Sequence, residues 1–189
     1  MRPKPSPLLA RNLTSPAAPA GYTLIETMVV LSIVGTLALY AVGSFRSIGS
    51  RIALDTATDN LVSTLALARV AAVHKQQRVS VCPGDTVNGC TGSSQWQLGW
   101  ITFIDVDRNR RLGAGESVLA AVGSMLGQLT INFRTPNTLS FNPDGSAWPN
   151  GHFKLCSPAV ARRRAVIVHL TGRARVSDRS PQGYAIDCS

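Results

Sequence analysis

The sequence has few acids, few histidines and no recognisable catalytic signature. Its 189 residues include 10 Asp and Glu, 19 Lys and Arg, and three His. It lacks a G-x-S-x-G nucleophile elbow and a phosphate-binding P-loop, and no His stands beside a candidate nucleophile, so we expect no enzyme activity and no cofactor. The four cysteines form no C-x-x-C pair and the His residues are scattered, which argues against a zinc site.

Charge is also missing from one long stretch near the start of the chain. No charged side chain occurs between Glu26 and Arg46, a gap of 19 residues. As a helix rising ~1.5 Å per residue, this gap would be ~28 Å long, close to the ~30 Å hydrocarbon core of a bilayer. We therefore expect a transmembrane helix at residues 22–47. A signal anchor or a secretory signal peptide is the alternative, although a signal peptide has a shorter apolar core, of ~7–15 residues.

The residues that begin this stretch resemble a known processing signal. Gly-Tyr-Thr-Leu-Ile-Glu at 21–26 is similar to the cleavage and methylation signature of type IV pilins and type II secretion pseudopilins. In that family, prepilin peptidase cuts after the glycine and methylates the new N-terminus. The resemblance implies that Gly21 ends a leader of residues 1–21 and that Tyr22, where Phe is usual, becomes the N-terminus. It also implies that Glu26 meets the N-terminal amine of a neighbouring subunit during fibre assembly.

The distribution of charge indicates which side of the membrane the domain occupies. The first 21 residues carry Arg2, Lys4 and Arg11 and no acid, so residues 22–189 retain +6 of the formal charge of +9. Basic residues before the apolar run follow the positive-inside rule. We expect a single-pass inner-membrane protein with a periplasmic domain at residues 48–189, which later enters a pilus fibre at the cell surface. A basic outer domain implies an acidic partner, namely nucleic acid, anionic lipid or an acidic protein.

The spacing of apolar residues along the sequence changes near residue 78, from the period of a helix to the alternation of a strand. Before it, apolar residues at three- and four-residue spacing predict that an amphipathic helix continues to about residue 75. These residues are Leu54, Ala57, Leu61, Leu65, Ala68 and Ala72. Beyond it, alternation predicts strands at 78–82, 95–104, 117–121, 129–133, 138–141, 152–156, 164–170 and 174–177. We expect an α+β, type IV pilin-like fold, in which a long N-terminal helix, half transmembrane and half amphipathic, packs on an antiparallel β-sheet domain.

The even number of cysteines favours disulfides in an exported domain. Three pairings are possible. We expect Cys82–Cys90 and Cys156–Cys188, because each closes a single segment that contains Gly, Ser or Pro. Loop-closure entropy would give ~2.5 kcal/mol for the first and ~3.7 kcal/mol for the second. Free buried thiols are the alternative.

Further motifs resemble minor pilins of the FimT/FimU type and GspH-type pseudopilins. They are CP at 82–83, GWITFID at 99–105, FNPDG at 141–145, FKLC at 153–156 and GRAR at 172–175. FimT-type minor pilins of naturally transformable bacteria bind DNA through a G-R-x-R motif in this region. The resemblance therefore implies a DNA-binding role for Gly172, Arg173 and Arg175 in natural competence.

Elementary geometry agrees with an anion-binding role for these arginines. In an extended segment Arg173 and Arg175 would point to one face, ~6.6 Å apart, a separation of the same order as neighbouring phosphates. Electrostatics adds Arg162, Arg163, Arg164 and Arg179 to the predicted DNA-binding residues. The alternative is a hairpin glycine beside merely solvated arginines. No aromatic platform is expected beside these arginines, so we expect phosphate-directed, sequence-independent binding.

Two other features have simpler explanations. Acids and Asn at 105, 107, 109 and 116 echo a calcium loop, but Arg110 replaces the sixth-position glycine and further arginines add repulsion. We therefore expect a β-hairpin whose acids shape its turn, and no metal site. Trp96, Trp100 and Trp148 are expected to pack in the core or in turns.

The sequence as a whole predicts a minor type IV pilin that binds DNA non-specifically for uptake in natural transformation. Its expected partners are other pilin subunits, prepilin peptidase, the inner membrane and the DNA phosphate backbone. The alternative is a structural or initiating minor pilin, or a GspH-like type II secretion pseudopilin, that binds no nucleic acid.

Overall fold

The computed structural model describes residues 21–133 and 137–188, without the side chains of residues 40–46. Of the predicted leader, only Gly21 falls within these residues. The chain divides into two compact units, Met1–Ala41 and Val42–Ser189. Within the part of the chain that is described, no helix is both long enough and apolar enough to cross a membrane. This finding does not confirm the membrane span expected at residues 22–47, which stays a prediction.

A single helix, α1 (Leu24–Lys75), continues past the apolar run as predicted. Thr23 caps its start, because the Thr23 hydroxyl accepts from the Glu26 backbone N–H at 3.4 Å and the Thr23 carbonyl accepts from that of Thr27 at 3.2 Å. In the first unit the apolar side chains of α1 are largely exposed, among them Leu24, Ile25, Met28, Leu31 and Leu37. Apolar surface of this extent usually marks a site that a partner or lipid covers.

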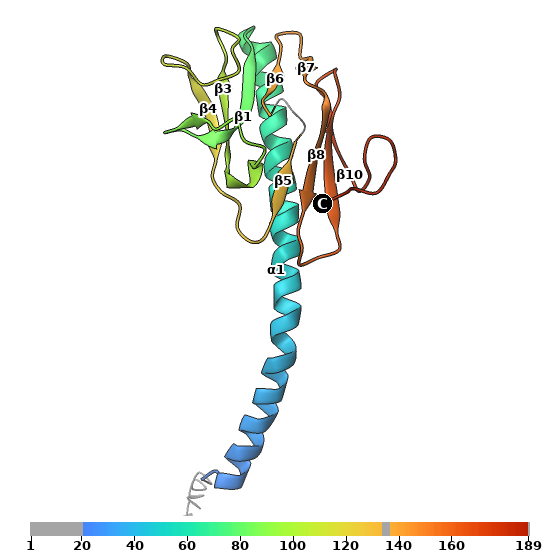
Figure 1. Ribbon diagram of the computed structural model, residues 1–189. Helices are drawn as coiled ribbons and strands as arrows, with labels where there is room; N and C mark the ends of the chain where they lie inside the picture. The colour runs from blue at the N-terminus through green and yellow to red at the C-terminus, as the bar shows by residue number, and fades with distance from the viewer. Residues whose placement is uncertain (1–20, 134–136, 189) are drawn as a thin grey trace, which may run out of the picture. The chain divides into compact units, whose positions relative to one another are not determined.

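In the second unit α1 buries the stripe that its spacing predicts. All six residues of that stripe, from Leu54 to Ala72, are at most 1% exposed. They share one core with Val79, Phe141, Phe153 and residues of both sheets. Figure 1 shows strands on either side of this part of α1. The prediction of a helix packed on antiparallel strands is therefore confirmed.

The strands form two antiparallel sheets. The first has the order β4-β3-β1-β6-β7, with β2 paired to β1. Its strands are β1 (Val79–Asp85), β2 (Gly89–Cys90), β3 (Trp100–Ile104), β4 (Val118–Val122), β6 (Leu139–Phe141) and β7 (Ala147–Trp148). The second has the order β10-β9-β8-β5. Its strands are β5 (Thr130–Asn132), β8 (Gly151–Cys156), β9 (Arg163–Val168) and β10 (Ala174–Ser177).

Each predicted strand is present, but several ends differ by up to three residues: the strand expected at 78–82 runs to Asp85, and the one expected at 164–170 ends at Val168. Two larger differences have local causes. The strand expected at 95–104 begins only at Trp100, because η1 (Trp96–Leu98), a 3₁₀ turn, precedes it and Gly99 has φ of 118°. A Cβ at Gly99 would lie 2.7 Å from the Val122 carbonyl oxygen, so this close contact requires glycine. The two-residue strands β2 and β7 were not predicted, because two residues are too few to show a period.

Both predicted disulfides, Cys82–Cys90 and Cys156–Cys188, are present. The first joins β1 to β2. The second ties the C-terminal segment to the end of β8, where Ile186 packs with Ala165 and Ile167. These residues lie on the outer face of the second sheet, which we define as the face that points away from α1. The C-terminal segment therefore covers one end of that face.

Candidate functional site

The GRAR motif forms the turn between β9 and β10. The Gly172 backbone N–H donates to the His169 carbonyl at 2.9 Å, and the His169 N–H donates to the Arg173 carbonyl at 3.0 Å. Gly172 has φ of 73°, a left-handed conformation that glycine adopts without the steric cost met by other residues. The turn therefore fixes the backbone from which Arg173 and Arg175 extend.

The space around Gly172 is too small for a side chain. A Cβ at this position would lie 2.0 Å from the Gly145 carbonyl oxygen and 3.0 Å from Arg69 Nε. Arg69 Nε, on α1, donates to the same Gly145 carbonyl at 3.1 Å. Because Gly172 has no side chain, the β9–β10 turn docks on the turn between β6 and β7. Arg69 and Gly145 thus position the motif, and no local pattern in the sequence indicates this role.

Arg173 and Arg175 are both exposed, on the same side of β10. Ala174 between them points the other way and packs against the core. The two arginines line a shallow pocket of about 600 Å³, together with Asn150, His169, Leu170, Thr171 and Ala174. Among the described residues, neither arginine forms an ion pair. Their guanidinium groups are therefore available to an anion.

Two more basic side chains lie on the same outer face. The register pairs Arg175 with Ile167, and Ile167 with His152 on β8. Lys154 follows two residues after His152 and so points to the same face. Burial, and then the positive charge of Lys154, lowers the pKa of His152 below its ordinary value. His152 is therefore neutral at neutral pH, and Lys154 is the cation that extends the face.

The other predicted arginines gather at the opposite end of the β9–β10 hairpin and are engaged within the chain. Arg162 pairs with Asp55 of α1 at 3.3 Å. Arg164 pairs with Asp55 at 3.6 Å and also with Asp178. The remaining two, Arg163 and Arg179, donate to the carbonyls of Ile186 and Gly183. These four side chains therefore form a separate cluster whose charge is partly neutralised, and their role in DNA binding stays a prediction.

The acidic loop between β3 and β4 is a hairpin connection shaped by its acids. Oxygens of Asp105, Asp107 and Glu116 lie within 4.8 Å of one another. They accept backbone N–H groups of the loop, for example Val106 to Glu116 at 2.8 Å and Asn109 to Asp107 at 3.0 Å. This arrangement agrees with the turn-shaping role expected for these acids.

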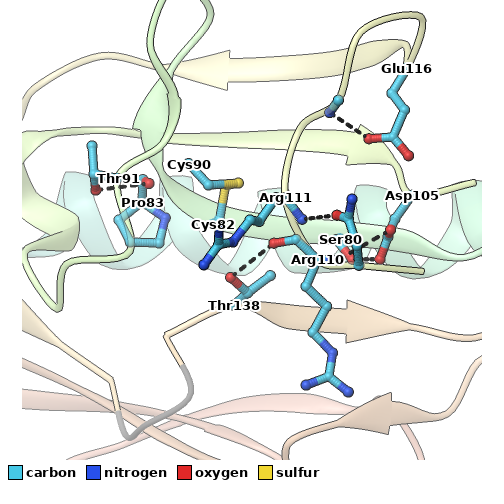
Figure 2. The surroundings of a disulfide bond; sticks show 12 residues. Ser80, Cys82, Pro83, Cys90, Thr91, Asp105, Arg110, Arg111, Glu116 and Thr138 are labelled. Carbon is cyan, nitrogen blue, oxygen red and sulfur yellow. Dashed lines mark hydrogen bonds between the residues drawn. A yellow bond between two sulfur atoms is a disulfide. The ribbon is translucent and has the colours of Figure 1, made fainter. Parts of the chain in front are cut away.

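The same loop brings an arginine onto a tryptophan. The Arg110 guanidinium carbon lies 3.8 Å from the centre of the Trp148 ring on β7. Figure 2 shows the Arg110 side chain extending away from Asp105 and Ser80. Burial, followed by repulsion from Arg78, lowers the pKa of Arg110, and Asp105 opposes the shift. Trp96 and Trp100 are fully buried as expected, whereas Trp148 is 44% exposed.

The predicted processing and assembly residues lie at the start of the described chain. Gly21 has no heavy atom within 4 Å of an added Cβ, and Tyr22 is 83% exposed. Tyr22 and Glu26 line a hollow on the first unit with Thr27, Val30 and Leu31. The segment is therefore open to an enzyme or a neighbouring subunit.

Comparisons with known proteins agree with this architecture. The type IV minor pilin FimU of Pseudomonas aeruginosa, solved in two crystal forms, is similar in structure. One form is 20% identical with a TM-score of 0.53, covering 70% of this chain and 96% of that one. The other is 19% identical with a TM-score of 0.50, covering 68% and 98%. At these identities the similarity establishes the fold alone. No curated protein matches the chain.

Family comparisons give the assignment. The prokaryotic N-terminal methylation motif matches residues 18–42. The family described as Type II transport protein GspH matches residues 57–172, which is more than half of the chain. The chain therefore belongs to the GspH family of minor pilins and pseudopilins.

Proposed function

We propose that this protein is a minor type IV pilin that binds DNA through the β9–β10 turn for uptake in natural transformation. The observation that carries the proposal is the pair of exposed arginines, Arg173 and Arg175, next to a turn in which Gly172 packs against the Gly145 carbonyl. Guanidinium groups suit phosphate oxygens, because they are planar, permanently charged and able to donate two hydrogen bonds at once.

The mechanism is neutralisation of backbone phosphates with release of counterions. Arg173 and Arg175 each take a phosphate oxygen, and Lys154 on the same face adds a further positive charge. Phosphate contacts fix position without reading sequence, so binding is not sequence-specific.

Assembly depends on the other end of the chain. Prepilin peptidase cuts after Gly21, and Tyr22 becomes the methylated N-terminus. The exposed apolar face of α1 in the first unit packs in the inner membrane and then against other pilins in the fibre. Glu26 pairs with the N-terminal amine of a neighbouring subunit. The domain at residues 48–189 faces the periplasm before assembly and the cell surface afterwards.

A second function has its own support. Arg162 and Arg164 are held by Asp55 and Asp178, so the basic cluster at the far end of the hairpin has a structural role in this chain. The matching family is described as a transport protein of type II secretion. A structural or initiating subunit that contacts only other subunits would account for both observations.

The test is DNA binding by the full processed chain in mild detergent. The variant Arg173→Gln with Arg175→Gln is compared with a control, Arg51→Gln with Lys75→Gln, which removes two exposed charges from α1. We expect the first variant to lose most of its DNA binding and the control to retain it. Equal binding by both variants would favour the second function, in which case co-purification with other minor pilins should persist.

A further inference from the structure

Trp148, on β7 of the first sheet, is an exposed tryptophan that the proposed binding of phosphates does not use. Trp148 is the exposed member of the three tryptophans, since Trp96 and Trp100 are fully buried. Its large aromatic ring is only partly buried, so part of it is open to a ligand with an apolar or aromatic surface.

The surroundings of Trp148 hold its ring in place. Arg110 stacks on the ring, with its guanidinium carbon 3.8 Å from the ring centre. Arg110 is itself held by the β3–β4 loop, where its backbone N–H donates to Asp105 at 3.3 Å and its carbonyl accepts from Thr138 at 3.4 Å. Arg110 therefore covers one face of the ring, while Trp148 as a whole is 44% exposed. The result is a partly exposed aromatic ring with a positive charge behind it.

Trp148 is also close to the arginine pair. Its neighbour Ala147 donates from N–H to the Leu170 carbonyl at 2.9 Å, just before the GRAR turn. Asn150, two residues after Trp148, lines the same pocket as Arg173 and Arg175. Two residues of chain span at most ~7 Å, so Trp148 and the pocket that Arg173 and Arg175 line are within reach of one short strand of nucleic acid.

We propose that Trp148, with Arg110 stacked on it, is a platform on which a DNA base stacks. The preferred ligand of the surface formed by Trp148, Arg173 and Arg175 is then single-stranded DNA. This inference rests on the proposed DNA-binding function. Aromatic rings in single-strand-binding proteins stack on unpaired bases, whereas the bases of a duplex are already stacked on one another. The arginine pair holds the phosphates of the strand, and Trp148 takes one of its bases.

The test uses the full processed chain with a short oligothymidylate and a duplex of the same length. Trp148→Ala is expected to weaken binding of the single strand by ~5- to 150-fold, the equivalent of ~1–3 kcal/mol per stacked base, and to leave duplex binding unchanged. Tyr184→Ala, which removes a 73% exposed aromatic ring from the C-terminal segment, is the matched control and should bind both as the unmodified chain does.

A second readout does not depend on removing the ring. Stacking of thymine on Trp148 should quench tryptophan fluorescence in the unmodified chain, and Trp148→Phe, which keeps an aromatic ring, should abolish the quenching. Persistent quenching in Trp148→Phe, or unweakened single-strand binding by Trp148→Ala, would overturn the platform. If Arg173→Gln with Arg175→Gln still loses binding in that case, the proposed function stands. If the unmodified chain binds neither the single strand nor the duplex, both the stacking platform and the proposed DNA-binding function are overturned.

Discussion

At the scale of the residue, Gly172 explains why the arginine pair stands where it does. A positive φ alone would make glycine favourable, but the approach of the Gly145 carbonyl to 2.0 Å from a Cβ position makes any larger residue clash with backbone. The glycine of the GRAR motif is therefore a packing requirement as well as a turn residue.

Replacing Gly172 by Ala should therefore cost more than replacing a glycine that needs only the left-handed conformation. Gly92, with φ of 69° and no heavy atom within 4 Å of an added Cβ, is the matched control. We expect Gly92→Ala to lose ~1–2 kcal/mol of unfolding free energy, and Gly172→Ala to lose at least ~1 kcal/mol more, because the turn must shift. Urea unfolding measures both, and equal losses would show that the contact with Gly145 is unimportant.

His152 gives the domain a pH dependence whose sign follows from its environment. Burial, and then Lys154, lowers its folded-state pKa below the ordinary value of 6.5, so the unfolded chain binds a proton more readily. Stability should fall as the pH drops below 6.5 and level off below the folded-state pKa. His152→Gln should flatten this part of the profile. Parallel profiles for the two proteins, from thermal unfolding at several pH values, would contradict the assignment.

At the scale of the element, local periodicity was enough to predict the helix and most strands. The stripe from Leu54 to Ala72 is buried as expected, because a helix hides the face on which apolar residues recur. The division into two sheets could not be predicted, because it depends on pairings such as that of β1 with β6, distant in sequence.

The candidate site shows the same limit. The motif at 172–175 was visible in the sequence, and the structure places its two arginines on one side of β10. Other contacts join residues far apart in the chain: Arg162 meets Asp55, 107 positions away, and Arg110 meets Trp148. No local pattern in the sequence marks such pairs. The ion pairs that partly neutralise Arg162 and Arg164, and the contact of Arg110 with Trp148, could therefore not be predicted.

The two disulfides should contribute to stability according to the loops that they close. Cys156 and Cys188 are separated by 32 positions, and Cys82 and Cys90 by 8. Replacing each pair by alanine should lower the unfolding free energy by ~3.7 and ~2.5 kcal/mol respectively. Without the Cys156–Cys188 bond the C-terminal segment should detach, yet DNA binding should persist because Arg173 and Arg175 lie at the other end of the hairpin. If the variant without the Cys156–Cys188 disulfide lost DNA binding, the C-terminal segment would have to be part of the DNA-binding site.

At the scale of the whole molecule, the proposed function assigns separable tasks to the two ends of the chain. Gly21→Val should block cleavage, since the peptidase needs glycine at this position, and the retained leader is detected by the mass of the protein. Glu26→Ala should be cleaved normally but fail to enter pili sheared from cells, because no carboxylate remains to pair with the neighbouring N-terminus. Normal incorporation of Glu26→Ala would contradict the assembly role of this residue.

The most direct test of the central claim, that Arg173 and Arg175 bind DNA phosphates, is the salt dependence of duplex binding by the full processed chain. The slope of log K against log salt should be less steep by ~1.8 in Arg173→Gln with Arg175→Gln than in the unmodified chain, since each phosphate contact contributes ~0.9. Identical slopes in the two proteins would contradict the claim.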